Sequence, residues 1–469
     1  MDETTLLKQL ARSLMTGQPK AATDPWRPHW HLAPPVGLLN DPNGFIQHQG
    51  RFHLFYQWNP LACAHGAKFW GHWSSSDLLH WRHEPVALVP SEPYESHGCY
   101  SGSAVVQDGR LTLLYTGNVK YADGSRTANQ CLAVENERGE FDKLGPVLPL
   151  PAGYTGHVRD PKVWRHDDRW YMVLGAQDLQ LQGKVLLLVS DDLRHWQNCG
   201  EIAGSGLHGL GDFGYMWECP DLFALEGQDI LIGCPQGLAA EPERYLNTHQ
   251  AGYWVGRLDY ERADFAHGEF RELDLGFEFY APQTTQTEDG RRLLFGWMGI
   301  PDQDEFYQPT VQQGWIHTMT CPRELSYRNG RLYQQPAREL TRLRGACSSW
   351  QGSANAAPQL PADSAELQLS STGPFCLSLL DALTLTWDGE RLTLSRRNLR
   401  SGELEQRFWR GDLQTLRLLC DHSSIELFIN DGEAVMSARY FPQGEVSFSL
   451  MGQAEVTLQH WPLARCVVE

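Results

Sequence analysis

Hydrophobic residues along this chain are grouped in short runs that follow polar turns. One run covers residues 52–56 and follows Gly50-Arg51; a similar run covers residues 111–115 and follows Gly109-Arg110. Runs of this length, rich in leucine and aromatic residues and bounded by turn residues, are typical of β-strands. The pattern therefore predicts a chain built mostly from strands.

The turn and its strand recur five times in the first two thirds of the chain. Aligned on positions 51, 110, 169, 229 and 291, successive copies are 59, 59, 60 and 62 residues apart. A unit of about sixty residues holds a four-stranded sheet with its loops, and such sheets bury one another's faces when arranged radially. A second recurrence, Ser76 to Trp81 and Ser190 to Trp196, supports the repeat. The repeat predicts a five-bladed β-propeller over residues 26–335.

The flanking segments complete the expected organisation. Leucines at helical spacing in residues 3–15 predict an N-terminal helical segment within residues 1–25. Residues 336–363, rich in Ser, Ala, Gly and Pro toward their end, are interpreted as a linker. Residues 364–469 alternate strand-like runs with turns, including a hairpin around Asp388-Gly389, and predict a β-sandwich. The fold class is therefore all-β, a five-bladed propeller followed by a sandwich.

Charge and composition exclude several classes of protein. The chain of 469 residues has 57 acidic and 39 basic residues, a net charge of −18 that would repel nucleic acid and anionic membranes. A secretory signal and an apolar run near the roughly 20 residues of a membrane span are both missing, so a cytoplasmic protein is expected. Eleven scattered cysteines without a Cys-x-x-Cys pair favour reduced thiols. Neither a metal ion nor an organic cofactor is expected.

Polar residues stand at a similar distance before each repeated strand. Between eight and eleven residues ahead of the aligned positions lie Asp41, Ser101, Asp160, Glu218 and Gln283. Equivalent positions of a repeat occupy equivalent places in the fold. If that place is the innermost strand of each sheet, the five side chains converge on the axis of the propeller.

Three carboxylates in one funnel point to acid and base chemistry. Like charges at short range raise at least one pKa, and glycoside hydrolysis uses a protonated carboxylic acid beside an ionised carboxylate. Each segment also has a structural interpretation, in which Asp41 belongs to an Asp-Pro-Asn-Gly turn, Asp160 pairs with its neighbour and Glu218 caps a loop. Their coincidence at one repeat phase favours the functional interpretation.

Local sequence suggests a role for each carboxylate. Glu218 lies in an apolar setting beside Trp217, which favours a protonated general acid. Asp41 has asparagine neighbours whose amides would keep it ionised, as a nucleophile requires. Asp160 follows an arginine and is expected to stay charged and bind sugar hydroxyls.

The chain resembles glycoside hydrolase family 32, the invertases, fructan hydrolases and sucrose-6-phosphate hydrolases, from about His29 to its C-terminus. The resemblance rests on six motifs in order: Asn40-Asp41-Pro42-Asn43-Gly44, Phe69-Trp70-Gly71-His72, Tyr100-Ser101-Gly102, Arg159-Asp160-Pro161, Trp217-Glu218-Cys219-Pro220 and Phe295-Gly296-Trp297-Met298. It implies a retaining double displacement on a β-fructofuranosyl group. In that mechanism Asp41 attacks the anomeric carbon, Glu218 is the acid and base, and Asp160 stabilises the transition state.

The resemblance also implies the substrate and the pocket around it. Bacterial intracellular sucrose and sucrose-6-phosphate hydrolases are the most similar members, and the expected partner is a small sugar that binds a monomer or homodimer. The residues implied to line the fructose pocket are Asn40, Gln57, Trp70, Tyr100, Ser101, Arg159 and Trp297.

Two departures from the family pattern concern the side of the site that holds the leaving group. Leu38-Leu39 stand where the family usually has Trp-Met, and His65 falls where the family has a tryptophan that packs on the substrate. Substrate choice therefore stays open between sucrose, sucrose-6-phosphate and short fructo-oligosaccharides. A fructosyl transglycosylase, a non-catalytic sugar-binding propeller and an inverting glycosidase are the alternatives.

Overall fold

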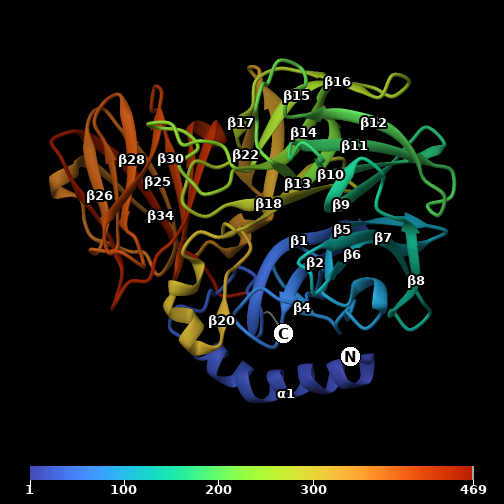
Figure 1. Ribbon diagram of the computed structural model, residues 1–469. Coiled ribbons are helices and arrows are strands. Elements are labelled where there is room, and N and C mark those ends of the chain that lie inside the picture. Colours follow the sequence, from blue (N-terminus) through green and yellow to red (C-terminus); the bar gives the residue numbers. More distant parts are fainter. Residues whose placement is uncertain (467–469) are drawn as a thin grey trace.

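The computed structural model describes residues 1–466, and within them the strands form seven sheets (Figure 1). Five sheets lie in residues 37–336 and two in residues 348–462. The prediction of an all-β protein is confirmed. Short 3-10 helices connect the strands: η1 (Pro93–Glu95), η2 (Glu305–Tyr307), η3 (Pro309–Gln313), η4 (Arg338–Leu343), η5 (Ala354–Ala356) and η6 (Asn430–Gly432).

Each of the five sheets in residues 37–336 begins with an antiparallel hairpin, and the repeated turn of the sequence joins its first two strands. The sheets, in chain order, are as follows: β1 (Gly37–His48), β2 (Arg51–Asn59), β3 (Phe69–Ser75) and β4 (Arg82–His83); β5 (Cys99–Gln107), β6 (Arg110–Lys120), β7 (Arg126–Glu135) and β8 (Phe141–Leu148); β9 (Tyr154–His166), β10 (Arg169–Asp178), β11 (Gly183–Ser190) and β12 (Gln197–Gly204); β13 (Met216–Leu225), β14 (Gln228–Gln236), β15 (Gly252–Asp259), β16 (Asp264–His267) and β17 (Arg271–Glu272); β18 (Tyr280–Gln286), β19 (Arg292–Trp297), β21 (Arg323–Arg328) and β22 (Arg331–Pro336).

The first strands of these sheets contact one another in cyclic order. β1 contacts β5, β5 contacts β9, β9 contacts β13, β13 contacts β18, and β18 contacts β1 again. Figure 1 shows the five strands grouped around the middle of this part of the molecule. A short strand, β20 (Trp315–Ile316), also pairs in parallel with β1 and links the chain after β19 to the first sheet. Residues on the first strands are therefore brought together from distant parts of the sequence.

The second recurrence of the sequence corresponds to a repeated turn in the structure. After β3 and after β11, an aspartate accepts hydrogen bonds from the histidine three residues later, in the pairs Asp77–His80 and Asp192–His195. The following tryptophan indole donates to the carbonyl of a leucine with positive φ in both turns. The same sequence thus builds the same turn in the first and third sheets.

The N-terminal helix is longer than its leucine pattern indicates. α1 covers Glu3–Ala22, beyond the expected residues 3–15. Leu6 and Leu10 are buried as the periodicity predicts, and Asp2 caps the first turn by accepting from a backbone amide. The last turns are held by tertiary contacts instead, because the Lys20 ammonium donates to the Gln312 carbonyl at 2.6 Å. No described helix is long and apolar enough to cross a membrane.

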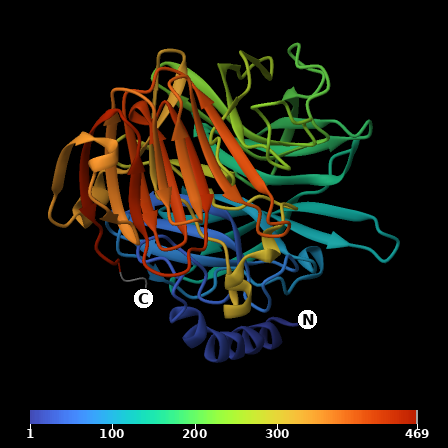
Figure 2. The same cartoon turned by 90° about the vertical axis from the view of Figure 1, so that its left-hand side faces the viewer.

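Two six-stranded sheets pack face to face beside the first five (Figure 2). The hairpin predicted around Asp388-Gly389 is confirmed. One sheet contains β23 (Ser348–Ser353), β34 (Glu455–Pro462), β25 (Ser364–Ser371), β30 (Leu416–Asp421), β31 (Ser424–Ile429) and β32 (Ala434–Arg439); the other contains β24 (Leu360–Pro361), β33 (Ser447–Met451), β26 (Phe375–Leu379), β27 (Leu383–Trp387), β28 (Arg391–Arg397) and β29 (Leu404–Arg410).

The segment interpreted as a linker contains two of these strands. β23 pairs with β34 over six residues and β24 pairs with β33, so residues 348–361 belong to the edges of the sandwich sheets. Their small polar composition hid this pairing, because an edge strand needs little apolar side-chain area. The connection without strands is shorter, from residue 337 to 347, and contains η4.

The cysteines and the aromatic residues are placed largely as the sequence predicts. All eleven cysteines, which lie between residues 63 and 466, are free thiols. Seven tryptophans are less than 2% exposed, and two of them, Trp217 and Trp254 of the fourth sheet, stack with ring centroids 4.4 Å apart. Most of the aromatic excess therefore stabilises packing.

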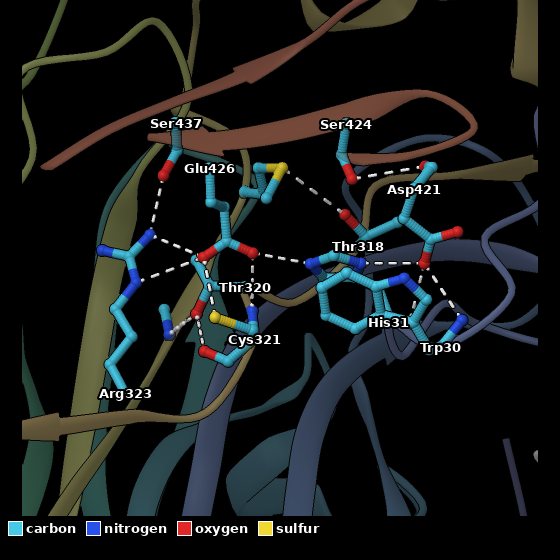
Figure 3. A network of polar contacts seen from close by, with 12 residues as sticks. Trp30, His31, Thr318, Thr320, Cys321, Arg323, Asp421, Ser424, Glu426 and Ser437 are labelled. Carbon is cyan, nitrogen blue, oxygen red and sulfur yellow. Dashed lines mark hydrogen bonds and ion pairs between the residues drawn. The ribbon is translucent and has the colours of Figure 1, made fainter. Parts of the chain in front are cut away.

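A buried charge network joins the first five sheets to the sandwich (Figure 3). The ring of His31, which precedes β1, contacts Asp421 at 2.9 Å and Glu426 at 2.6 Å in the sandwich. Glu426 also accepts from Arg323 of β21 at 2.9 Å. These four side chains are fully buried. Buried charges are costly unless paired, so this network favours one fixed arrangement of the two parts.

The network predicts a pH-dependent stability that His31 carries. Although burial disfavours the charged ring, the two carboxylates raise the pKa of His31 from 6.5 to about 9. A raised pKa stabilises the fold fully below pH 6.5, and the contribution, about 3 kcal/mol, is lost as the pH rises through 9. The difference in unfolding free energy between wild type and His31→Gln is therefore expected to be largest near pH 6 and to shrink toward pH 10.

Urea unfolding followed by tryptophan fluorescence at pH 6, 8 and 10 measures this difference. His80→Gln is the matched control, because its ring is 59% exposed in a surface pair, and it should change stability little. A gap between wild type and His31→Gln that does not change with pH would contradict the prediction.

Candidate active site

The first strands of the five sheets are irregular at the same level. Each pairing of a first with a second strand contains a register shift, at the residues around Asp41, Ser101, Asp160, Cys219 and Ala281. Three of these bulges contain a proline, which cannot donate to the ladder, and in β1 a proline directly follows the bulge. Bulges bend a strand and re-aim its side chains. Here they bring side chains of five sheets to one place.

Asp41 of β1 is held by side chains of two strands. The Ser101 hydroxyl of β5 donates to Asp41 Oδ2 at 2.5 Å, and the Asn40 amide donates to Asp41 Oδ1 at 3.1 Å. Asn40 in turn accepts from the buried Lys68 ammonium at 2.6 Å. The hydrogen bonds from Ser101 and Asn40 therefore fix the orientation of the Asp41 carboxylate.

Asp160 of β9 lies beside Asp41 and shares a neighbour with it. The Cys219 thiol of β13 is 3.6 Å from an oxygen of Asp41 and 3.6 Å from an oxygen of Asp160. The Cys219 backbone amide donates to Asp160 Oδ2 at 2.9 Å, and the Asp160 amide donates to Thr116 Oγ1 at 3.1 Å. Asp160 has a φ of 68°, a left-handed conformation uncommon outside glycine. Such strain is concentrated at functional sites.

Glu218 of β13 is the third carboxylate, and it is enclosed by donors. Two nitrogens of Arg159 donate to Glu218 Oε1, at 2.7 and 3.0 Å. The Tyr280 hydroxyl and the Gln236 amide donate to Glu218 Oε2 at 2.6 and 3.0 Å. The three carboxylates predicted from the sequence are thus brought together, from the first, third and fourth sheets.

The electrostatics of the site differ from what local sequence suggests. Although burial favours the neutral acid, Arg159 and the hydroxyl of Tyr280 hold the pKa of Glu218 below its usual range. Burial raises the pKa of Asp160 to about 7, and the charges of Glu218 and Asp41 add to this effect. Burial, followed by the charge of Glu218, also raises the pKa of Asp41, against its hydrogen bonds.

The expectation of a protonated Glu218 and two ionised aspartates is therefore wrong for the site without a sugar. It considered chain neighbours, whereas Arg159 reaches Glu218 from another sheet. Since burial and the neighbouring negative charges raise the pKa of Asp160 and of Asp41, the site favours a retained proton on the aspartates.

Counting back from the aligned turn positions misplaced Glu218 and Gln283 relative to the other repeats. Asp160, Cys219 and Ala281 share a positive φ immediately before a proline, so they are equivalent, and Glu218 stands one residue earlier. Gln283 lies two residues beyond Ala281, and its side chain bonds to backbone groups of the first and second sheets, at 2.9 Å each. Gln283 therefore does not hold the equivalent repeat position, although it lines one small pocket with Ser101 and Asp160.

Sequence reasoning also missed the contacts of Tyr280 and Cys219. Tyr280 stands one residue before Ala281, as Glu218 stands one residue before Cys219. Alignment on the residue-proline pairs of the first strands would have revealed both positions.

Within the described residues, the remaining predicted pocket residues form no hydrogen bond with the three carboxylates. The Gln57 amide donates to Asn43 at 2.9 Å and to a backbone carbonyl at 2.8 Å. Trp70 is fully buried, and its indole donates to the Tyr100 carbonyl at 3.0 Å. Trp297 is 1% exposed, and its indole nitrogen has no partner among the described residues. In this structure Gln57 and Trp70 contact the segments that carry Asp41 and Ser101, and not the carboxylates themselves.

The two departures from the family pattern lie in different surroundings. Leu38 and Leu39 are fully buried in β1. His65 is part of a polar network near the site, because its ring contacts Lys68 at 2.9 Å and Glu305 at 2.9 Å. Glu305 also contacts the ring of His317 at 2.7 Å. At the position where the family has a packing tryptophan, this chain therefore has a histidine that is held by hydrogen bonds.

One set of ligand atoms in the described residues has the spacing of a metal site. Asp41, Asp160 and Cys219 each offer one atom, and these atoms lie within 4.8 Å of one another. A thiol binds metal as thiolate, whereas its contact with Cys234 and its burial raise the pKa of Cys219 well above the usual range. The donor set therefore fits a cluster of acids better than a metal centre.

The bond from Ser101 predicts a shifted pH profile. This bond lowers the pKa of Asp41, so Ser101→Ala should raise it and move the acid limb of kcat/KM to higher pH, with roughly a 10-fold loss of kcat/KM at neutral pH. Rates on a cleaved substrate between pH 4 and 8 measure the shift. Ser103→Ala is the control, because this hydroxyl donates to the Pro161 carbonyl instead. An acid limb that stays in place would contradict the prediction.

Two models of one protein family match this chain, and together they cover most of its length. Residues 31–336 match the model of the glycosyl hydrolases family 32 N-terminal domain, and residues 339–462 match that of the family 32 C-terminal domain. A sucrose-6-phosphate hydrolase of Salmonella typhimurium is 59% identical over 467 residues, 99% of each chain. One of Bacillus subtilis is 48% identical over 459 residues, 95% of this chain and 96% of its own.

Solved structures agree with these relatives. A sucrose-6-phosphate hydrolase from Lactobacillus gasseri superposes with a TM-score of 0.90 at 31% identity, over 97% of both chains. A mutant β-fructofuranosidase from Bombyx mori, solved in complex with sucrose, superposes with a TM-score of 0.88 at 36% identity, over 99% of both chains.

Proposed function

The chain belongs to glycosyl hydrolase family 32, and we propose that it hydrolyses the β-fructofuranosyl bond of sucrose-6-phosphate, with sucrose as a poorer substrate. It is a glycoside hydrolase that acts on fructosides. The observation that carries the proposal is the grouping of three carboxylates: the Cys219 thiol lies 3.6 Å from an oxygen of Asp41 and of Asp160, and the charge of Glu218, the residue before Cys219, acts on both aspartates. Relatives named sucrose-6-phosphate hydrolase over the full length support the phosphorylated substrate.

The proposed architecture is a five-bladed propeller followed by a sandwich. The cyclic contacts of the five first strands support five blades around one axis. The separate family models for residues 31–336 and 339–462 support a boundary near residue 337. A monomer or homodimer and a cytoplasmic location stay predictions.

The proposed reaction is a double displacement with retention. Asp41 attacks the anomeric carbon of the fructosyl group, and Glu218 protonates the departing glucose oxygen and then activates water. Asp160 accepts hydrogen bonds from fructose hydroxyls in the oxocarbenium-like transition state. Asn40, Ser101 and Arg159 are positioning residues in this scheme, because each contacts one of the carboxylates.

The proton must be redistributed when the sugar binds. In the free site Glu218 is the stronger acid and Asp41 is weakened. Hydroxyls that donate to the aspartates lower their pKa values, and a glycosidic oxygen beside Glu218 favours its neutral form. The substrate thus sets the protonation that the reaction needs.

The test compares kcat/KM of the wild-type protein on sucrose-6-phosphate, sucrose and an inulin-type oligosaccharide. We expect kcat/KM to be highest on sucrose-6-phosphate, lower on sucrose and lowest on the oligosaccharide, with free fructose as product. Oligofructosides as the main product at high sucrose would favour the transglycosylase, and no release of fructose would favour a sugar-binding protein. Product anomers observed directly by NMR would separate retention from inversion.

A further inference from the structure

Arg126, the first residue of β7, lies beside the active site and has no ion-pair partner in the described part of the chain. Its two terminal nitrogens contact His157 Nδ1 at 3.3 Å and Asn118 Oδ1 at 2.5 Å. Its guanidinium lies 5.8 Å from the ring centre of Tyr100. Its Nε is buried and unpaired, and within residues 1–466 no carboxylate oxygen forms an ion pair with it. A partly buried arginine is rarely left in this state.

The surroundings of Arg126 are positively charged. Arg159 also donates to His157 Nδ1, at 2.8 Å, so two guanidinium groups share one ring nitrogen as acceptor. His157 adds no charge, because burial and the two arginines lower its pKa to about 4. The charge of Arg159 is balanced by Glu218, whereas that of Arg126 is not. Lys120, exposed and opposite Arg126 in the strand register, adds a further positive charge.

This cluster is unusual in a protein with a net charge of −18. The planar guanidinium group of arginine binds phosphate through two parallel hydrogen bonds. Burial and repulsion from Arg159 lower the pKa of the Arg126 guanidinium. A phosphate beside Arg126 would supply the missing negative charge and offset this repulsion.

The place of the cluster indicates which part of a substrate it faces. Arg126 is connected to Glu218 through His157 and Arg159. Glu218 is the residue that the proposed reaction places at the oxygen of the leaving group. An anion on Arg126 would therefore belong to the leaving group, whereas the fructosyl group lies on the side of Asp41 and Asp160.

We propose that Arg126, with Lys120 at the rim, binds the 6-phosphate of the leaving glucose and makes this site selective for sucrose-6-phosphate over sucrose. The inference rests on the proposed function, since it assigns a specificity residue for that same reaction. It leaves the roles of the three carboxylates unchanged. The structural alternative is that Arg126 only ties β6 and β7 to β9 through Asn118 and His157.

Arg126→Gln separates the two. If Arg126 binds the phosphate, kcat/KM on sucrose-6-phosphate falls about 10- to 100-fold, whereas kcat/KM on sucrose falls far less. Inhibition by glucose-6-phosphate should weaken by a similar factor, whereas inhibition by glucose should not. Arg110→Gln is the matched control. Arg110 is exposed and begins β6, at the opposite end from Lys120, so kcat/KM on both substrates should stay unchanged.

Equal losses on both substrates, or no loss on either, would overturn the inference. Arg126→Lys serves as the second variant if Arg126→Gln unfolds, because it keeps the charge and loses the fork; it should recover part of the selectivity. A wild-type protein that releases fructose from neither substrate would instead refute the proposed function. Release of fructose with unchanged selectivity in Arg126→Gln would refute only the phosphate site.

Discussion

Asp41→Asn is expected to lose nearly all hydrolysis, with kcat lower by roughly 10⁴- to 10⁶-fold, while the protein still folds. The amide is close to the carboxylate in size and can still accept from Ser101, but it cannot form the fructosyl-enzyme ester. The loss should be the same for sucrose and sucrose-6-phosphate, because Asp41 faces the fructosyl group that both share. Initial rates of fructose release over long incubations measure it.

The control for folding is the unfolding midpoint of Asp41→Asn, which should equal or exceed that of the wild type. Removing one of three clustered acids relieves repulsion, and functional sites commonly carry such a cost in stability. Turnover of Asp41→Asn within 100-fold of the wild type, in a preparation checked by mass for deamidation, would remove Asp41 as the nucleophile.

Glu218→Gln should lower sucrose hydrolysis by about 10²- to 10⁴-fold, and the loss should depend on the leaving group. A glutamine cannot protonate the glucose oxygen, so a fructoside with an acidic, readily departing aglycone should be cleaved with a much smaller loss. The basic limb of the kcat profile, which reports the acid in the enzyme–substrate complex, should disappear as well. Rates on sucrose and on an aryl fructoside across pH 5 to 9 measure both effects.

The same variant allows the covalent step to be observed. With an activated fructoside, Glu218→Gln forms the fructosyl-enzyme but lacks the base for its hydrolysis, so the adduct should accumulate in the intact mass of the protein. The double variant Asp41→Asn, Glu218→Gln is the control and should show no adduct. An equal loss for good and poor leaving groups would exclude Glu218 as the general acid.

The sequence predicted the site well where the repeat carried the information. A spacing near sixty residues placed Asp41, Asp160 and Glu218 on the first strands of three sheets before any contact was known. The catalytic roles assigned to them stay predictions. The alignment failed by one or two residues at Glu218 and Gln283, because bulges insert residues that a fixed count from the next strand does not register.

Local sequence was a poor guide to ionisation and to edge strands. The protonation expected for Glu218 came from its chain neighbours, whereas its pKa is set by Arg159, 59 positions away. The strand β23 has few apolar residues and pairs with β34 more than a hundred residues later. Both errors have one cause, since the deciding partner is distant along the chain.

By itself the sequence determined the all-β class, the sixty-residue unit and the set of acids available for chemistry, because periodicity and residue type are properties of the chain. Only the tertiary structure decided which groups meet: Arg159 with Glu218, the Cys219 thiol with both aspartates, and Arg126 with Asn118 and His157 but, within residues 1–466, with no carboxylate. Charge interactions act over a few ångströms in space. The pKa values, and the place where a phosphate would bind, are therefore fixed by folding.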